Sequence, residues 1–272
     1  DRERLRPPAE VCHNAMDYLL SVFFQERSMT SEKRPAERLY FRQLLAGRDF
    51  AVDDPVAAQM MNFVYLIGDR ETRECVVVDP AWDVDALARI AQSDEMKIIG
   101  ALGSHYHPDH LGGEMMGYTV TGAGRLLEIL PVKVHVQERE TLWVKRVTGL
   151  SDSDLQAHAG GDILKVGEIP IQFVHTPGHT QGSSCFLVDG KRLVAGDTLF
   201  VGSCGRVDLP GSDPEEMYRS LTQRLAKLPD DVALYPGHDY GDAPTSTLGA
   251  ERRSNYAMKV PTLERWLEMM VR

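Results

Sequence analysis

Seven histidine and aspartate residues stand at spacings that fit metal binding. The densest group is His105-Tyr-His-Pro-Asp-His110, which places three imidazoles and one carboxylate within six residues. The others are His179 and His238, each in a Pro-Gly-His sequence, and Asp197 after a glycine. A lone histidine is more often a surface or core residue, but this set offers the nitrogen and oxygen ligands that zinc, iron and manganese accept. The pattern predicts a metal site formed by His105, His107, Asp109, His110, His179, Asp197 and His238.

The number of candidate ligands is sufficient for two metal ions. Alternate side chains of an irregular loop can face neighbouring centres, so we expect His105 and His107 to bind one ion, and Asp109 and His110 a second. The two Pro-Gly-His histidines complete the sites, and Asp197 bridges them. Two divalent ions about 3.5–4 Å apart lower the pKa of a bridging water and polarise a carbonyl, which supplies hydroxide for hydrolysis at pH 7. Asp109 is then also the candidate catalytic residue that accepts or relays a proton.

A second interpretation of the same residues needs only one ion. His105, His179 and Asp197 form a set of two histidines and one carboxylate, which leaves positions open on iron(II) for oxygen and substrate. The ligand types alone permit either zinc or iron. Hydrolysis by two ions and oxidation by one iron therefore both remain open from these residues.

The candidate ligands follow segments that are predicted to be β-strands. Short apolar runs bounded by turn residues predict strands at 63–67, 75–78, 98–102, 132–136, 171–174, 184–188, 191–195 and 232–235. His105, His179, Asp197 and His238 each come directly after one of these runs. Strand ends at one edge of a packed sheet bring together side chains that are distant in sequence and hold them rigidly.

Turn and helix signals complete the expected α/β pattern. Asp189-Gly190 separates two strand-like runs and predicts a type I′ hairpin turn, because both positions tolerate a positive φ. Asp213 can cap a helix that begins with Pro214 and runs to about residue 228. Further helices are predicted at 84–91, 138–147 and 262–270.

The composition limits the classes of partner and compartment. The chain has 40 acidic and 30 basic residues and a formal net charge of −10, which argues against nucleic acid or an anionic membrane surface as the main partner. Its longest apolar segment, Met16 to Phe24, is much shorter than the roughly 20 residues that span a bilayer. Four scattered cysteines without CxxC spacing favour a reducing compartment. We expect a cytoplasmic protein, or a mitochondrial-matrix protein if the source is eukaryotic.

Two regions are expected along the chain. Residues 1–38 combine an apolar, helix-like segment with a polar, charged run, and we interpret them as an N-terminal helical extension and linker. Residues 39–272 form the catalytic domain. The extension could pack on the domain, contact a second copy in a homodimer, or attach the protein to a larger assembly.

Beyond the ligand motif, the chain resembles the metallo-β-lactamase superfamily, and within it the glyoxalase II and persulfide dioxygenase branch, over residues 40–255. The resemblance implies an αββα sandwich, two mixed β-sheets flanked by helices, with the metals at one edge. The segment from Gly196-Asp197 to Arg206 looks like the part of glyoxalase II that carries the bridging aspartate and, nine residues later, a basic residue that holds a glutathione carboxylate. Arg206 is therefore the leading substrate-binding candidate.

Other stretches look more like persulfide dioxygenases. They are Tyr65 to Pro80, Cys204-Gly-Arg-Val-Asp208 and His238-Asp-Tyr240. The chain also departs from both groups, because 68 residues separate His110 from His179, with an apparent insertion within 126–158. The long C-terminal helical domain of glyoxalase II is not expected here.

These observations rank the candidate functions. Hydrolysis of a thioester such as an acyl-glutathione comes first, and oxidation of a glutathione persulfide by mononuclear iron comes second. Lactone or β-lactam hydrolysis is third, and a non-catalytic metal-binding protein is the alternative of a different class. We expect a small-molecule substrate, contacted by Arg206, Cys204, Asp208 and Tyr240. Cys204 is expected to shape the substrate loop as a small residue rather than to act as a nucleophile.

Overall fold

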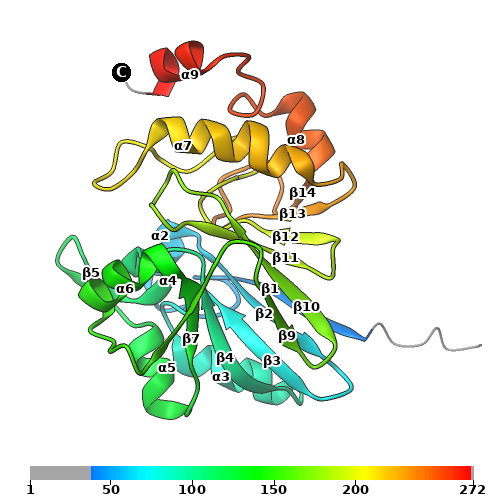
Figure 1. The fold of residues 1–272 in the computed structure, drawn as a ribbon. Coiled ribbons are helices and arrows are strands. Elements are labelled where there is room, and N and C mark those ends of the chain that lie inside the picture. Colours follow the sequence, from blue (N-terminus) through cyan, green and yellow to red (C-terminus); the bar gives the residue numbers. More distant parts are fainter. Residues whose placement is uncertain (1–37, 271–272) are drawn as a thin grey trace, which may run out of the picture. The chain divides into compact units, whose positions relative to one another are not determined.

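The computed structural model describes residues 38–270 (Figure 1). The helical extension and linker predicted for residues 1–38 lie outside the described residues, apart from Arg38. Two six-stranded sheets dominate the described part of the chain. In the first, the order is β1 (Leu39–Leu45), β2 (Phe63–Asp69), β3 (Glu74–Val78), β4 (Lys97–Gly103), β7 (Val134–Gln137) and β8 (Leu155–His158). In the second, it is β14 (Ser246–Thr247), β13 (Ala233–Tyr235), β12 (Arg192–Val194), β11 (Ser184–Val188), β10 (Ile169–His175) and β9 (Ile163–Val166).

Both sheets are mixed. In the first sheet, β1, β2 and β3 pair antiparallel, whereas β3, β4, β7 and β8 pair parallel. In the second, only β12 and β13 pair parallel. A separate hairpin consists of β5 (Gly113–Met115) and β6 (Tyr118–Val120). The residues of the apparent insertion include β7 and β8, which extend the first sheet.

Alternation along the strands places a core on each face of the first sheet. In β2, Phe63, Tyr65 and Ile67 face the second sheet and pack in one cluster with Phe173 and Phe186. The intervening Val64 and Leu66 belong to a second cluster on the opposite face, which includes residues of helix α3 (Val84–Ser93). The first sheet is therefore buried on both faces.

Helices cover the outer face of each sheet, so the layers run helix, sheet, sheet, helix (Figure 1). The outer face of the second sheet packs against α7 (Pro214–Arg219), α8 (Leu248–Ser254) and α9 (Leu263–Met270). The remaining α-helices of residues 38–270 are α2 (Pro55–Met60), α4 (Pro108–Leu111), α5 (Ala123–Ile129) and α6 (Thr141–Thr148). This arrangement confirms the predicted αββα sandwich. Within residues 38–270, no helix has the length and apolar character needed to cross a membrane.

Two local predictions are confirmed. The hairpin turn is present, because φ is 49° at Asp189 and 65° at Gly190. Asp213 caps α7 as predicted, accepting from the Glu216 amide, and the helical segment extends to Lys227, near its predicted end. It changes from α-helix to a π turn over Ser220–Arg224 and then to a 3₁₀ turn over Leu225–Lys227. The Ser220 hydroxyl donates to the Pro177 carbonyl at 2.6 Å. This bond to a neighbouring loop accompanies the departure from α-helical geometry.

Backbone hydrogen bonds join the loops that leave one edge of the two sheets. The Ser184 amide donates to the Ser104 carbonyl at 3.0 Å, which links the loop after β4 to the second sheet. The Gly237 amide donates to the Gly196 carbonyl at 2.9 Å, which links the loops after β12 and β13. These bonds fix the relative positions of the loops that carry the predicted ligands.

Candidate metal centre

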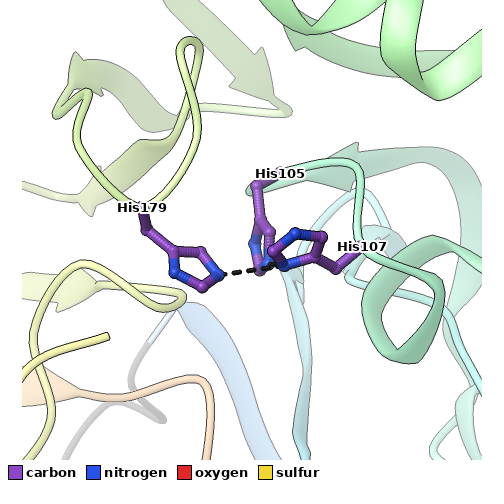
Figure 2. Close-up of side chains that lie close together, drawn as sticks. All are labelled: His105, His107 and His179. Atoms are coloured by element: carbon purple, nitrogen blue, oxygen red, sulfur yellow. Dashed lines mark hydrogen bonds between the residues drawn. The ribbon is translucent and has the colours of Figure 1, made fainter. Parts of the chain in front are cut away.

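Three histidines form a first ligand cluster at the edge where the loops meet. His105 and His107 come from the loop after β4, and His179 comes from the loop after β10 (Figure 2). His107 Nδ1 lies 3.0 Å from His105 Nε2 and 3.0 Å from His179 Nε2. One nitrogen from each ring can therefore face a common centre.

A second cluster contains Asp109, His110 and His238. Asp109 and His110 lie in the short helix α4, and His238 follows β13. The Nε2 atoms of the two histidines are 3.2 Å apart, and each lies 3.4 Å from Asp109 Oδ2. All three residues are buried.

Asp197 lies between the two clusters. Its Oδ1 atom is 3.3 Å from His110 Nε2 and 3.4 Å from His238 Nε2, whereas its Oδ2 atom is 3.6 Å from His179 Nε2. Among the residues that the structure describes, Asp197 Oδ1 is also a buried side-chain oxygen with no hydrogen-bond partner. A buried carboxylate oxygen without a donor is costly, and a bound cation would compensate that cost.

The outer nitrogen of three histidines is held by a carbonyl or carboxylate acceptor. Two Nδ1 atoms donate to backbone carbonyls, that of His179 to Arg206 and that of His238 to Met60, both at 2.8 Å. His110 Nδ1 donates to Asp79 Oδ2 at 2.9 Å. Because a carbonyl or carboxylate only accepts, the proton of each neutral imidazole lies on Nδ1 and the Nε2 lone pair faces inward.

Ser104 orients His105 in the same manner. The Ser104 hydroxyl donates to Asp79 Oδ2 at 2.7 Å, so its oxygen accepts from His105 Nδ1 at 3.0 Å. Asp79 thus supports one histidine of each cluster. It follows β3 in a Val-Val-Val-Asp-Pro run, a strand-end signal that could have identified it from sequence.

Burial keeps His105 and His107 of the first cluster neutral. It lowers the pKa of His105 well below its usual value, and it lowers the pKa of His107 to about 4, with the neighbouring imidazoles adding to both effects. Neutral imidazole is the form that binds a metal ion.

Nearby carboxylates raise the pKa values of both histidines in the second cluster. Burial disfavours the charged imidazole and by itself would lower the pKa of His110. The charges of Asp109, Asp197 and Asp79 outweigh this effect and raise the pKa of that ring well above the usual value. The pKa of His238 rises to about 9 because Asp197 and Asp109 likewise outweigh burial. The pocket therefore favours positive charge, carried either by protons or by a cation that replaces them.

Glu140 joins the two loops of the first cluster, and no motif in the sequence singles it out. It is fully buried. One carboxylate oxygen accepts from the Tyr106 amide at 2.9 Å, between His105 and His107. The other accepts from the Thr180 hydroxyl at 2.6 Å and the Gly182 amide at 2.7 Å, next to His179.

Arg206 and Asp208 pair with each other at the surface. The Arg206 guanidinium donates to both Asp208 carboxylate oxygens, at 2.9 and 2.8 Å, and the side chains are 67% and 59% exposed. An exposed pair of this type is weak. A substrate carboxylate could therefore take the place of Asp208 on the guanidinium.

The other two substrate candidates differ in exposure. Tyr240 is 47% exposed and its ring stacks on His238 with centroids 4.5 Å apart, so it lies beside the second cluster. Cys204 is 9% exposed, and burial raises the pKa of its thiol to about 12. A neutral buried thiol is a poor nucleophile.

Three further histidines lie outside the clusters. His135 Nδ1 and His158 Nε2 are 2.8 Å apart, and His175 Nε2 lies 3.0 Å from the Gln181 carbonyl. The Arg252 guanidinium donates to the Leu225 and Leu228 carbonyls, so it also has a structural role.

The αββα sandwich and its clustered histidines and aspartates define a class of metal-dependent enzymes. The family model described as "Metallo-beta-lactamase superfamily" matches residues 58–238, which contain all seven predicted ligands. The chain belongs to the metallo-β-lactamase superfamily. Its histidine and aspartate clusters are metal-binding sites typical of enzymes in that family.

Similar proteins within the superfamily have different activities. The mitochondrial persulfide dioxygenase ETHE1 of Homo sapiens is 31% identical over 196 residues, 71% of this chain and 70% of that protein. A hydroxyacylglutathione hydrolase of a Polaromonas species is 34% identical over 182 residues, 66% of this chain and 62% of that protein. The crystal structure of ETHE1 from Myxococcus xanthus superposes with a TM-score of 0.69 at 29% identity, covering 85% of this chain and 90% of that one.

Proposed function

We propose that the protein is a hydrolase with two metal ions that cleaves a thioester, such as an acyl-glutathione. The observation that carries the proposal is the position of Asp197, whose two oxygens face different ligand clusters. A single iron held by His105, His179 and Asp197 would also use this carboxylate, but it would leave Asp109, His110 and His238 without an ion. The similarity to a hydroxyacylglutathione hydrolase supports the same reaction class.

The residues around the clusters have distinct roles in this reaction. Two divalent ions, when bound, supply a water of lowered pKa and polarise the thioester carbonyl. Asp109 accepts or relays the proton of that water. Arg206 binds a carboxylate of the small-molecule substrate through paired hydrogen bonds, displacing Asp208, and Tyr240 lines the approach to the second cluster.

Persulfide oxidation is the second candidate, and the similarity to ETHE1 over 70% of that protein is the observation that favours it. In this reaction, His105, His179 and Asp197 would hold a single iron, and the second cluster would have no catalytic role. The two candidates therefore differ in their dependence on His238.

The test compares wild-type protein with His238→Ala, each loaded separately with zinc and with iron(II). Thiol release is measured with lactoyl-glutathione, and oxygen uptake is measured with glutathione persulfide. We expect thiol release by the wild-type protein, a loss of about 100-fold or more in His238→Ala, and no oxygen uptake with persulfide. His158→Gln, in β8 outside the clusters, is the matched histidine control and should retain activity.

Two results would count against thioester hydrolysis. Oxygen uptake by the iron-loaded protein that survives in His238→Ala would establish the dioxygenase instead. Metal binding without activity on either compound would assign the site to another substrate.

A further inference from the structure

Asn62 is a buried polar residue that contacts the second cluster without being one of its predicted ligands. It is 1% exposed and lies directly before β2. Its Nδ2 atom donates to Asp109 Oδ2 at 3.1 Å and lies 3.4 Å from the Nε2 atoms of His110 and His238. The amide nitrogen thus approaches all three residues of the second cluster.

Trp82 determines which end of the amide faces the cluster. Its indole Nε1 donates to Asn62 Oδ1 at 3.1 Å. An indole nitrogen only donates, so its partner must be the amide oxygen, and the NH2 group is the end that points toward the second cluster. Trp82 is 4% exposed, and its backbone amide donates to the Thr121 carbonyl at 2.7 Å, which fixes its own position.

The backbone around Asn62 is attached to the segment that carries His238. The Phe63 amide donates to the Gly237 carbonyl at 2.8 Å, and the Asp239 amide donates to the Met61 carbonyl at 3.0 Å. These bonds hold the backbone on either side of Asn62 beside the segment that carries His238.

We propose that the Trp82–Asn62 pair makes the second cluster the weaker of the two metal sites. An amide NH2 group offers no lone pair to a cation, and the positive end of its dipole opposes one. In the described part of the chain, the inward nitrogens of the first cluster contact only other candidate ligands. The pair would thus control whether one or two ions are bound. The inference rests on metal binding by both clusters, as in the proposed function, but not on the substrate.

The experiment is a Zn²⁺ titration of the metal-free protein against a competing chelator. The wild-type protein should show two binding steps whose dissociation constants differ by about tenfold or more. His238→Ala should abolish the weaker step, and His107→Ala should weaken the tighter step, which assigns each step to its cluster.

Asn62→Asp tests the role of the amide directly. It places a carboxylate oxygen where the NH2 group stands and leaves the other oxygen to accept from Trp82. The weaker step should tighten by about 10–100-fold. Asn62→Leu removes the NH2 group without adding a ligand, and the weaker step should not weaken further. Gln92→Glu is the control for added charge, because it lies near Lys97, at the opposite end of β4 from the metal site.

Three results would overturn the inference. Equal affinities of the two sites in the wild-type protein, or an unchanged weaker step in Asn62→Asp, would show that the amide does not set the difference. Loss of the weaker step in Asn62→Leu would show that the amide supports the site. The absence of a second step in both the wild-type protein and Asn62→Asp would overturn the two-ion proposal as well.

Discussion

At the scale of single residues, the Glu140 carboxylate joins the two loops that carry His105, His107 and His179 through three hydrogen bonds. It accepts hydrogen bonds from both loops although it binds no candidate metal position itself. Burial raises its pKa, and the three donors oppose that rise. Its contribution to the site is therefore one of position rather than of chemistry.

Removing this carboxylate should weaken metal binding at the first cluster. We expect Glu140→Ala to lower the affinity for zinc by about 10–100-fold, because the two loops lose their common acceptor. Glu140→Gln should lower the zinc affinity too, since both Glu140 oxygens accept hydrogen bonds and the new NH2 group would face one of those donors. The measurement is chelator competition, with the exposed Glu138→Gln of the same turn as control. Unchanged affinity in Glu140→Ala would contradict the positioning role.

The residues that hold the histidine rings could only partly be predicted from sequence. The candidate ligands themselves could be selected from sequence, because most of them follow an apolar strand and their types match a metal. The acceptors at His179 and His238 are backbone carbonyls, which every residue type provides. Asn62 and Glu140 were also missed, since their roles depend on contacts across 47 and 34 residues of chain.

At the scale of elements, close packing between the His179 loop and α7 restricts the sequence. Gly178 has a φ of 146°, and a Cβ atom there would lie 2.4 Å from Met217 Cα. A side chain at this position must shift either the helix or the loop. We expect Gly178→Ala to lower the free energy of unfolding by about 2–4 kcal/mol and to weaken metal binding at His179.

Denaturant unfolding and zinc competition measure the two effects. Gly124→Ala provides the control, because it lies in α5 and its added Cβ would meet no atom within 4 Å. Alanine favours a helix, so this variant should be as stable as the wild-type protein or about 0.5–1 kcal/mol more stable. Equal stability of Gly178→Ala and the wild-type protein would contradict the packing argument.

A pair of histidines connects β7 and β8 and should make stability depend on pH. Burial lowers the pKa of His135 to about 4, with a smaller effect from His158. The unfolded chain therefore binds a proton at His135 more readily than the folded chain does. Above the unfolded pKa near 6.5, His135 is neutral in both states and does not reduce stability. As the pH falls from 6.5 toward 4, the unfolded chain binds a proton at His135 and the free energy of unfolding decreases.

The prediction is tested by unfolding the wild-type protein and His135→Gln at several pH values, with a chelator present to remove effects of bound metal. The wild-type protein should lose more stability than the variant between pH 6.5 and 4, by about 1–3 kcal/mol. Parallel curves for the two proteins would show that His135 is not buried in its neutral form.

Some helices and strands could be predicted from the sequence and others could not, and the difference has physical reasons. Strands with continuous apolar runs, such as β2 and β3, were recognisable because both of their faces are buried. The edge strand β8 has the sequence Leu-Gln-Ala-His and is partly exposed, so it carries no apolar signal. The π turn at Ser220–Arg224 accompanies a hydrogen bond to a distant loop, and no local pattern encodes that bond.

At the scale of the whole molecule, the two sheets serve to bring seven side chains to one edge. The family assignment and the αββα fold agree on the place of the site, and the clusters on either side of Asp197 define its internal organisation. The same scaffold is reused for many substrates, so the fold alone does not choose between thioester hydrolysis and persulfide oxidation. The number of bound ions is the property that separates the two most directly.

The most direct measurement is therefore the metal content of the wild-type protein, His107→Ala and His238→Ala after equilibration with excess zinc and removal of unbound ions. We expect about two ions per wild-type chain and about one in each variant, since each substitution removes a candidate ligand from a different cluster. About one ion per wild-type chain, unchanged in His238→Ala, would contradict the two-ion site.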